Sequence, residues 1–173
     1  MRMTGVRRQH GQATVEFALV AIALLMLLFA IVDFGTYFAG RVAATNAARS
    51  AARYAATHPT AWSNASNPPS NTIEGKLVSA SVPAQIINDD SHVTVSYVVP
   101  GMGAGVTCGQ YSAASNAFVA ASGYTQSTCV VPGNLVRVHA VYNYTFATPI
   151  TGLVGITQTM LTVDGAAAEL EEA

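Results

Sequence analysis

The chain has 173 residues, which is enough for one domain with an extension and too few for two sizeable domains. Hydrophobic residues make up 51% of it and charged residues only 10%, against roughly 25% charged residues in ordinary soluble domains. The apolar content excludes a disordered chain, and the scarcity of charge argues against a plain cytoplasmic enzyme. The net charge of −1 provides no basic field that would hold nucleic acid.

The N-terminal part of the chain contains one long apolar run. Residues 17–32 are apolar at every position, and they lie between two acids, Glu16 and Asp33. These 16 residues rise about 24 Å as a helix, which is less than a hydrocarbon core of about 30 Å. The run therefore spans a membrane only if flanking residues join it, with Glu16 and Asp33 near the two interfaces. Because a helix that is apolar on all sides needs lipid or a large protein around it, we predict membrane insertion.

The arginines around this run are evenly divided. Three precede it and three follow it, namely Arg2, Arg7, Arg8, Arg41, Arg49 and Arg53. The positive-inside rule weighs the basic residues near both ends of a span, so this balance does not decide the orientation. The leading arginines lie close to the free N-terminal amine, which favours an N-terminus in the cytoplasm and a C-terminal head outside it.

An alanine-rich stretch without Gly or Pro follows over residues 41–57. Because alanine is the best helix former, we expect one helix over residues 12–57, ended by the dipeptide at 58–59. A polar stripe with a four-residue repeat consists of Arg41, Thr45, Arg49 and Arg53. A different side carries mostly small residues, namely Val42, Ala43, Ala47, Ala51 and Tyr54. The small residues predict close packing against copies of this helix or relatives of it.

A short motif stands directly ahead of the apolar run. Residues 11–17 read Gly-Gln-Ala-Thr-Val-Glu-Phe and look like a type IV prepilin cleavage site. Together with residues 31–35 and the Asn-Ala-Ala-Arg helix of residues 46–55, the motif resembles the TadE-like family. Members of that family are minor pilins, or pseudopilins, of tight-adherence (Tad/Flp) pilus systems. The resemblance covers roughly residues 8–57.

The resemblance implies particular roles for residues of the motif. An aspartic prepilin peptidase in the membrane would cut between Gly11 and Gln12, and Glu16, followed by Phe17, would be the acid needed for assembly. Cleavage would leave the new ammonium group of Gln12 four residues from Glu16, on the same helical face. A partner's ammonium could then pair with the Glu16 carboxylate and set the axial register of two helices. The alternative is that Glu16 only marks the membrane interface.

The resemblance also implies a function and a location. Major pilins of this system consist of little beyond the helix, so the head of about a hundred residues implies a minor pilin for assembly, initiation or capping of the pilus. The implied partners are the prepilin peptidase, other minor pilins, the major pilin, the inner-membrane assembly platform and membrane lipid. The implied location is the cytoplasmic (inner) membrane, crossed once with the head outside, and the pilus.

The remainder of the chain is expected to be an exported head. We expect a cleaved leader over residues 1–11, a transmembrane and stalk helix over 12–57, a linker over 58–72 and the head over 73–173. Apolar residues near 73–78 predict a short helix, and alternation predicts strands over 92–99 and 135–146, with a last strand over 158–164. The fold class is therefore α+β, a long N-terminal helix followed by a small antiparallel β-sheet head in a pilin-like layout.

The two cysteines, Cys108 and Cys129, bracket a Gly/Ser/Ala-rich segment that we expect to be a loop. A disulfide between them would close about 22 residues and stabilise the head by about 3 kcal/mol on the chain-entropy model. The bond requires an oxidising compartment, which agrees with export of the head. The alternative is two free thiols.

The sequence contains no recognisable active-site motif, so we expect neither an enzyme nor a cofactor or metal site. Asp89, Asp90 and His92 carry metal-capable groups, but an Asn/Asp cluster ahead of a strand is more often a turn. An envelope-bound enzyme would depend on this cluster alone. The stronger alternative is an exported binding protein, soluble or anchored, with an ordinary signal peptide. Its small-residue cleavage site would be residues 42–44, and the released chain would start at Thr45.

Overall fold

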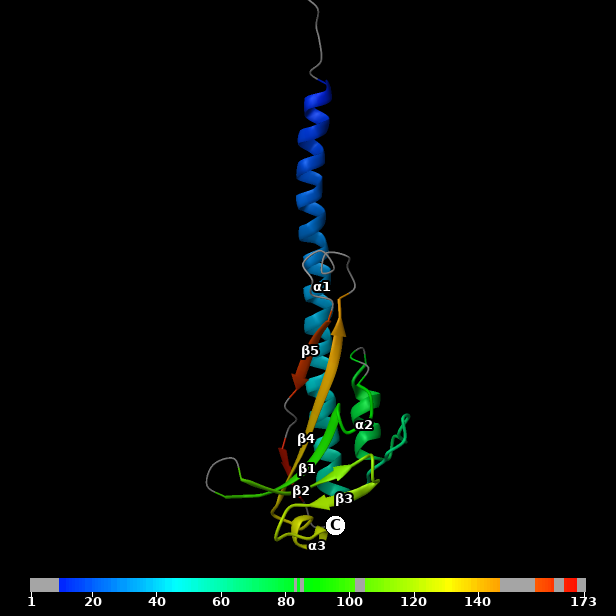
Figure 1. Cartoon of the computed structure of the whole chain (residues 1–173), viewed down its shortest axis with the longest axis vertical. Coiled ribbons are helices and arrows are strands. Elements are labelled where there is room, and N and C mark those ends of the chain that lie inside the picture. Colours follow the sequence, from blue (N-terminus) through cyan, green and yellow to red (C-terminus); the bar gives the residue numbers. More distant parts are fainter. Residues whose placement is uncertain are drawn as a thin grey trace, which may run out of the picture.

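The computed structural model describes residues 10–82, 84, 86–101, 105–146, 158–163 and 167–170. Its first element is the helix α1 (His10–Thr57), whose 48 residues give a length of about 72 Å. Figure 1 shows α1 as a shaft whose N-terminal half projects beyond the head, while its C-terminal half lies against the head. The expected helix over 12–57 is confirmed. The leading arginines Arg2, Arg7 and Arg8 lie outside the described residues.

The head is built on an antiparallel sheet. Its strands are β1 (Val93–Val99), β2 (Val106–Ser112), β3 (Ala117–Ala120), β4 (Leu135–Thr145), β5 (Gln158–Val163) and β6 (Ala167–Glu169). The strand order is β3-β2-β1-β4-β5, and β6 pairs with the first residues of β4, beyond the stretch that pairs with β5. Every strand pair is antiparallel. The predicted α+β layout, a long helix followed by an antiparallel sheet, is confirmed.

The strands predicted over 92–99, 135–146 and 158–164 correspond to β1, β4 and β5, with Asp164 outside the described residues. The prediction of a loop between the two cysteines is wrong. That segment contains most of β2, all of β3 and the short helix α3 (Gln126–Cys129). The burial pattern of β2 does not alternate, and Gly109 within it lies under the ring of Phe118, where no Cβ fits. Because polar and apolar residues do not alternate along β2, its sequence lacks the pattern by which strands are predicted.

The core lies between the C-terminal half of α1 and the sheet. The helix contributes fully buried small residues, namely Ala44, Ala47, Ala48, Ala51, Ala52 and Ala55. The larger side chains come from the facing elements, and they are Ile73, Leu77, Val93, Val95, Val136 and Val138. Alanines let the helix backbone approach β4 and the helix α2 (Ile73–Ala80), which both contact α1. The small-residue stripe, expected to pack on other copies, therefore packs on the chain's own head, and Val42 is excluded from it because it is 59% exposed.

Residues 58–72, expected to be a linker, pack against the head. The ring of Trp62 stacks on that of Tyr111 with centroids 5.2 Å apart, and its Nε1 donates a 2.9 Å hydrogen bond to the hydroxyl of Tyr97. The Pro69 carbonyl oxygen lies so close to Gly75 of α2 that a Cβ there would collide with it. The polar composition of the segment predicted a linker, but one tryptophan and one close backbone approach hold it against the head.

Candidate functional site

The first part of the candidate site is the projecting half of α1. The helix is long and apolar enough over Ala13–Thr57 to cross a membrane, and none of its most apolar window is buried. Large apolar side chains are exposed on all of its sides, from Val15 to Val32. Exposed apolar surface on this scale requires a partner, either lipid or the helices of other subunits.

The predicted processing residues lie at the start of this half. Gly11, Gln12, Glu16 and Phe17 occupy the first turns of α1, with open space where a Cβ of Gly11 would point and Phe17 74% exposed. Gln12 and Glu16 are one helical turn apart, because α-helices place residues i and i+4 on one face. The side chain of Gln12 lies outside the described set. The backbone geometry thus has the spacing that the register hypothesis requires.

The second acid, Asp33, lies where the projecting half meets the head. It is only 6% exposed, although Val32 and Phe34 beside it are 45% and 63% exposed. The hydroxyl of Tyr144 donates to the Asp33 carbonyl oxygen at 3.1 Å, and the Thr36 hydroxyl donates to the same oxygen at 3.0 Å. The end of β4 therefore bonds to the backbone of Asp33. Sequence reasoning placed this acid at a membrane edge but gave no signal for the strand that bonds to it.

The predicted polar stripe of α1 points away from the sheet. Arg41, Arg49 and Arg53 are exposed, and the Thr45 hydroxyl donates a 2.8 Å hydrogen bond to the Arg41 carbonyl oxygen. A shallow groove on this face is lined by Phe38, Arg41, Val42, Thr45, Asn46 and Arg49. The part of α1 beyond the apolar run thus has two faces, one covered by the head and one basic and open.

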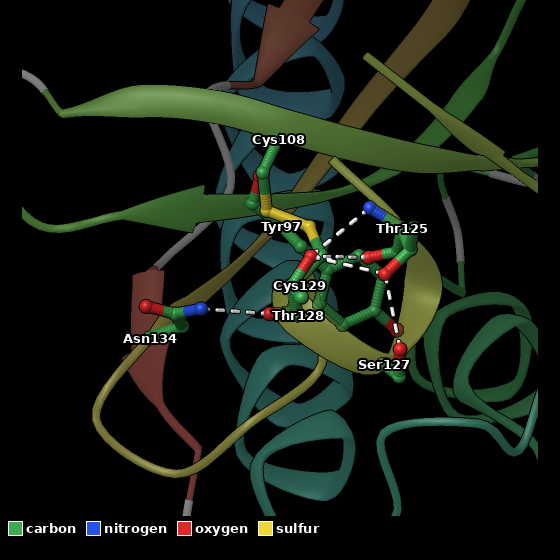
Figure 2. Close-up of a disulfide and its surroundings, with 7 residues drawn as sticks. All are labelled: Tyr97, Cys108, Thr125, Ser127, Thr128, Cys129 and Asn134. Atoms are coloured by element: carbon green, nitrogen blue, oxygen red, sulfur yellow. Dashed lines mark hydrogen bonds between the residues drawn. A yellow bond between two sulfur atoms is a disulfide. The ribbon is translucent and has the colours of Figure 1, made fainter. Parts of the chain in front are cut away.

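The predicted disulfide joins Cys108 of β2 to Cys129 of α3, with their Cα atoms 5.7 Å apart (Figure 2). Both cysteines are fully buried. The Asn134 side chain donates a 2.8 Å hydrogen bond from Nδ2 to the Cys129 carbonyl oxygen, which holds the end of α3 from the other side. The disulfide therefore fastens α3 to the sheet.

Sequence reasoning missed one buried acid, Glu74 in the first turn of α2. It is 1% exposed; its Oε2 accepts a 2.8 Å hydrogen bond from the Ser63 backbone N–H, and its Oε1 is buried without a hydrogen-bond partner among the described residues. Burial raises the pKa of the Glu74 carboxyl to about 7, although backbone hydrogen bonds, that of Ser63 included, lower it. The sequence signal that could have placed Glu74 is the N-cap residue Thr72. A helix that begins after Thr72 has Glu74 in its first turn.

The acidic cluster ahead of β1 forms turns. Asp89 Oδ1 accepts 2.9 Å hydrogen bonds from the backbone N–H groups of Ser91 and His92, and it contacts His92 Nδ1 at 2.7 Å. The Ser91 hydroxyl donates a further hydrogen bond of 2.6 Å to the same oxygen. This bond makes the largest contribution, and together the hydrogen bonds lower the pKa of Asp89 to about 2. Asp90 Oδ2 accepts from the Ser112 hydroxyl at 2.8 Å and thereby fastens the β2–β3 turn. Within the described ranges, no group of three or more His, Cys, Asp or Glu residues could hold a metal ion.

The fold and the site together define a class. A helix that is apolar and exposed at one end, and packed through alanines on an antiparallel sheet at the other, is a pilin-like α+β layout whose free end suits a membrane anchor or a pilin stalk. Residues 11–53 match the family model described as TadE-like protein. This match lies wholly within α1 and covers less than half of the chain; it confirms the TadE-like resemblance of that helix, in a family linked to Tad pilus machinery. No curated protein and no solved structure matches the chain.

Proposed function

We propose that this chain is a minor pilin that acts in the assembly, initiation or capping of a Tad/Flp pilus. The observation that carries the proposal is the TadE-like match on α1, a helix whose N-terminal half is apolar and exposed while its C-terminal half is already covered by the chain's own head. Other subunits would then contact the exposed half and the basic face of α1, because its alanines are already covered by the chain's own head.

Processing would come first. A membrane prepilin peptidase would cut between Gly11 and Gln12, removing residues 1–11 and leaving a helix that starts at the new ammonium of Gln12. This cut places the charge one turn from Glu16. The head, residues 73–173 with 58–72 packed on it, would stand outside the cytoplasmic membrane.

Register would come second. Opposite charges attract strongly where little water is present, so Glu16 would favour a neighbouring helix that presents an ammonium at the same depth in the membrane. The neighbours would be other minor pilins or the major pilin, brought together on the inner-membrane assembly platform. Phe17, 74% exposed, would pack beside this pair.

Two measurements in the native host test the proposal. The first is the intact mass and N-terminal sequence of the membrane-extracted chain, for which we expect a start at Gln12. The second compares Glu16→Gln, which removes the charge and keeps the shape, with Val20→Ala on the same segment. We expect cleavage in both variants, but loss of piliation and of cross-linking to other pilins only in Glu16→Gln.

Other results would contradict the proposal in distinct ways. A chain that starts at Thr45 would indicate an exported binding protein released by a signal peptidase. That cut would fall beside Ala44, which lies mid-helix and is fully buried, whereas proteolysis favours exposed and irregular backbone. Normal piliation in Glu16→Gln would refute the register role.

A further inference from the structure

The end of β4 lies beside the end of the apolar run of α1. The ring of Tyr142 lies against Gly40, and the Tyr144 hydroxyl contacts Asp33 and Thr36. The strand therefore advances toward the N-terminal end of α1, as Figure 1 shows. A strand rises about 3.3 Å per residue and a helix 1.5 Å, so Phe146, which directly follows β4, lies up to about 6.6 Å beyond Tyr144 and near the last turn of the run.

The length of the run places this junction at a membrane boundary. Residues 17–32 rise about 24 Å, so a hydrocarbon core of about 30 Å requires about four more residues of helix. If residues 33–36 supply them, the Tyr144 contacts lie within the hydrocarbon layer. If residues 13–16 supply them, the hydrocarbon ends at the turn just ahead of Asp33. At either depth of α1 in the bilayer, the end of β4 reaches the interface.

The side chains at this level suit an interface. The half-buried Phe146 lies edge to face with the buried Tyr144, with centroids 5.1 Å apart, and aromatic residues are enriched where hydrocarbon meets water. On the open side of α1, the apolar surface continues past Asp33 with Phe34 and Phe38, which are 63% and 53% exposed. Asp33 itself is buried and its carbonyl oxygen accepts a hydrogen bond from Tyr144, which keeps polar groups away from lipid.

We propose that Phe34, Phe38 and Phe146 form a collar that is seated in the outer interfacial layer of the bilayer, with the buried Tyr144 packed behind Phe146, so that the end of β4 contacts lipid while the rest of the head stands outside. The occupant of this surface is lipid, because the collar continues the apolar surface of the run without a gap. The inference rests on the membrane anchoring in the proposed function. It adds that the head has a set height and tilt on the membrane.

Tryptophan quenching in phosphatidylcholine vesicles tests the collar. The full chain is reconstituted at a high lipid-to-protein ratio with lipids brominated either near the carbonyl group or near the end of the acyl chain. Each variant keeps the native Trp62, whose emission reports that the head is folded. The added tryptophans are Phe146→Trp and Phe38→Trp in the collar, Leu25→Trp inside the run, and Val119→Trp on β3 at the far end of the head as the matched control (Figure 1).

We expect bromine near the carbonyl group to quench most of the added emission in Phe146→Trp and Phe38→Trp. Deep bromine should quench Leu25→Trp, and neither lipid should affect Val119→Trp or the unmodified chain. Quenching of Leu25→Trp without quenching of the collar variants would overturn the collar and leave the anchor intact. Absence of quenching at Leu25→Trp would overturn the anchor as well. Collar tryptophans shielded from acrylamide but unquenched by lipid would show that protein occupies the surface, which also refutes the proposal.

Discussion

The hydroxyl group of Tyr144 donates a hydrogen bond of 3.1 Å to the backbone carbonyl oxygen of Asp33, which lies 111 positions earlier in the sequence. The bond joins the end of β4 to α1 at the level where the exposed apolar run stops. Tyr37 adds an edge-to-face ring contact with Tyr144, with centroids 5.5 Å apart. Helix and head are therefore connected along most of the covered half of α1, and a force on the helix acts directly on the sheet.

Replacement of Tyr144 by Phe should weaken this junction. The variant keeps the ring contacts and loses the hydroxyl, which contacts both Asp33 and Thr36. One buried hydrogen bond contributes about 1 kcal/mol, so we expect the Tm in detergent, followed by Trp62 emission, to fall by about 2–4 °C. Tyr124→Phe, far from the junction, is the control. An equal fall in both variants would contradict the special role of Tyr144.

Two glycines of α1 should respond in opposite ways to alanine. A Cβ on Gly40 would collide with the hydroxyl of the buried Tyr142 and lie 3.0 Å from its Cζ, whereas a Cβ on Gly35 would meet nothing within 4 Å. Overpacking costs about 1–3 kcal/mol, and relief of a helical glycine gains about 1 kcal/mol. Thermal unfolding should therefore show a lower Tm for Gly40→Ala and a higher Tm for Gly35→Ala. A rise in both would mean that the Tyr142 ring moves aside freely.

Removal of the disulfide should destabilise the head and leave α1 helical. The bond spans 21 positions between Cys108 and Cys129, so its loss in the double alanine variant should lower the free energy of unfolding by about 3 kcal/mol. Urea titration of Trp62 emission measures this change, and far-ultraviolet circular dichroism monitors the helix. A reductant present during the titration should destabilise the native chain alone. An effect of the same size on the double variant would show that the reductant acts elsewhere.

The stability of the head should depend on pH through Glu74. The folded state raises the pKa of this carboxyl from 4.5 to about 7, so the folded chain binds more protons than the unfolded chain between those values. The stabilising contribution is complete below pH about 4.5 and is lost as pH rises to about 7, a change of about 3 kcal/mol. The Tm of Glu74→Gln, compared with that of the native chain at pH 5 and pH 7.5, should lack this component. Parallel profiles for the two chains would refute the assignment.

Much of this layout follows from residue pattern alone. The unbroken apolar residues 17–32 and the alanines that follow predict a single helix, because a single segment in lipid satisfies its own backbone hydrogen bonds only as a helix and alanine favours helix outside it. The alternation along β1 and β4 predicts two strands of a sheet. The motif at Gly11 and Glu16 carries the family resemblance. These signals are local, since each lies within one continuous stretch of chain.

The tertiary structure decided what each surface faces. The stripe of Ala47, Ala51 and their neighbours suits any close partner, and only the folded head shows that the partner is β4 and α2 of the same chain. The hydrogen bond of Tyr144 to Asp33 and that of Trp62 to Tyr97 join positions that are 111 and 35 residues apart in sequence. A sequence pattern gives the periodicity of an element and its polarity. Which element fills the space beside it depends on long-range packing, which no local pattern records.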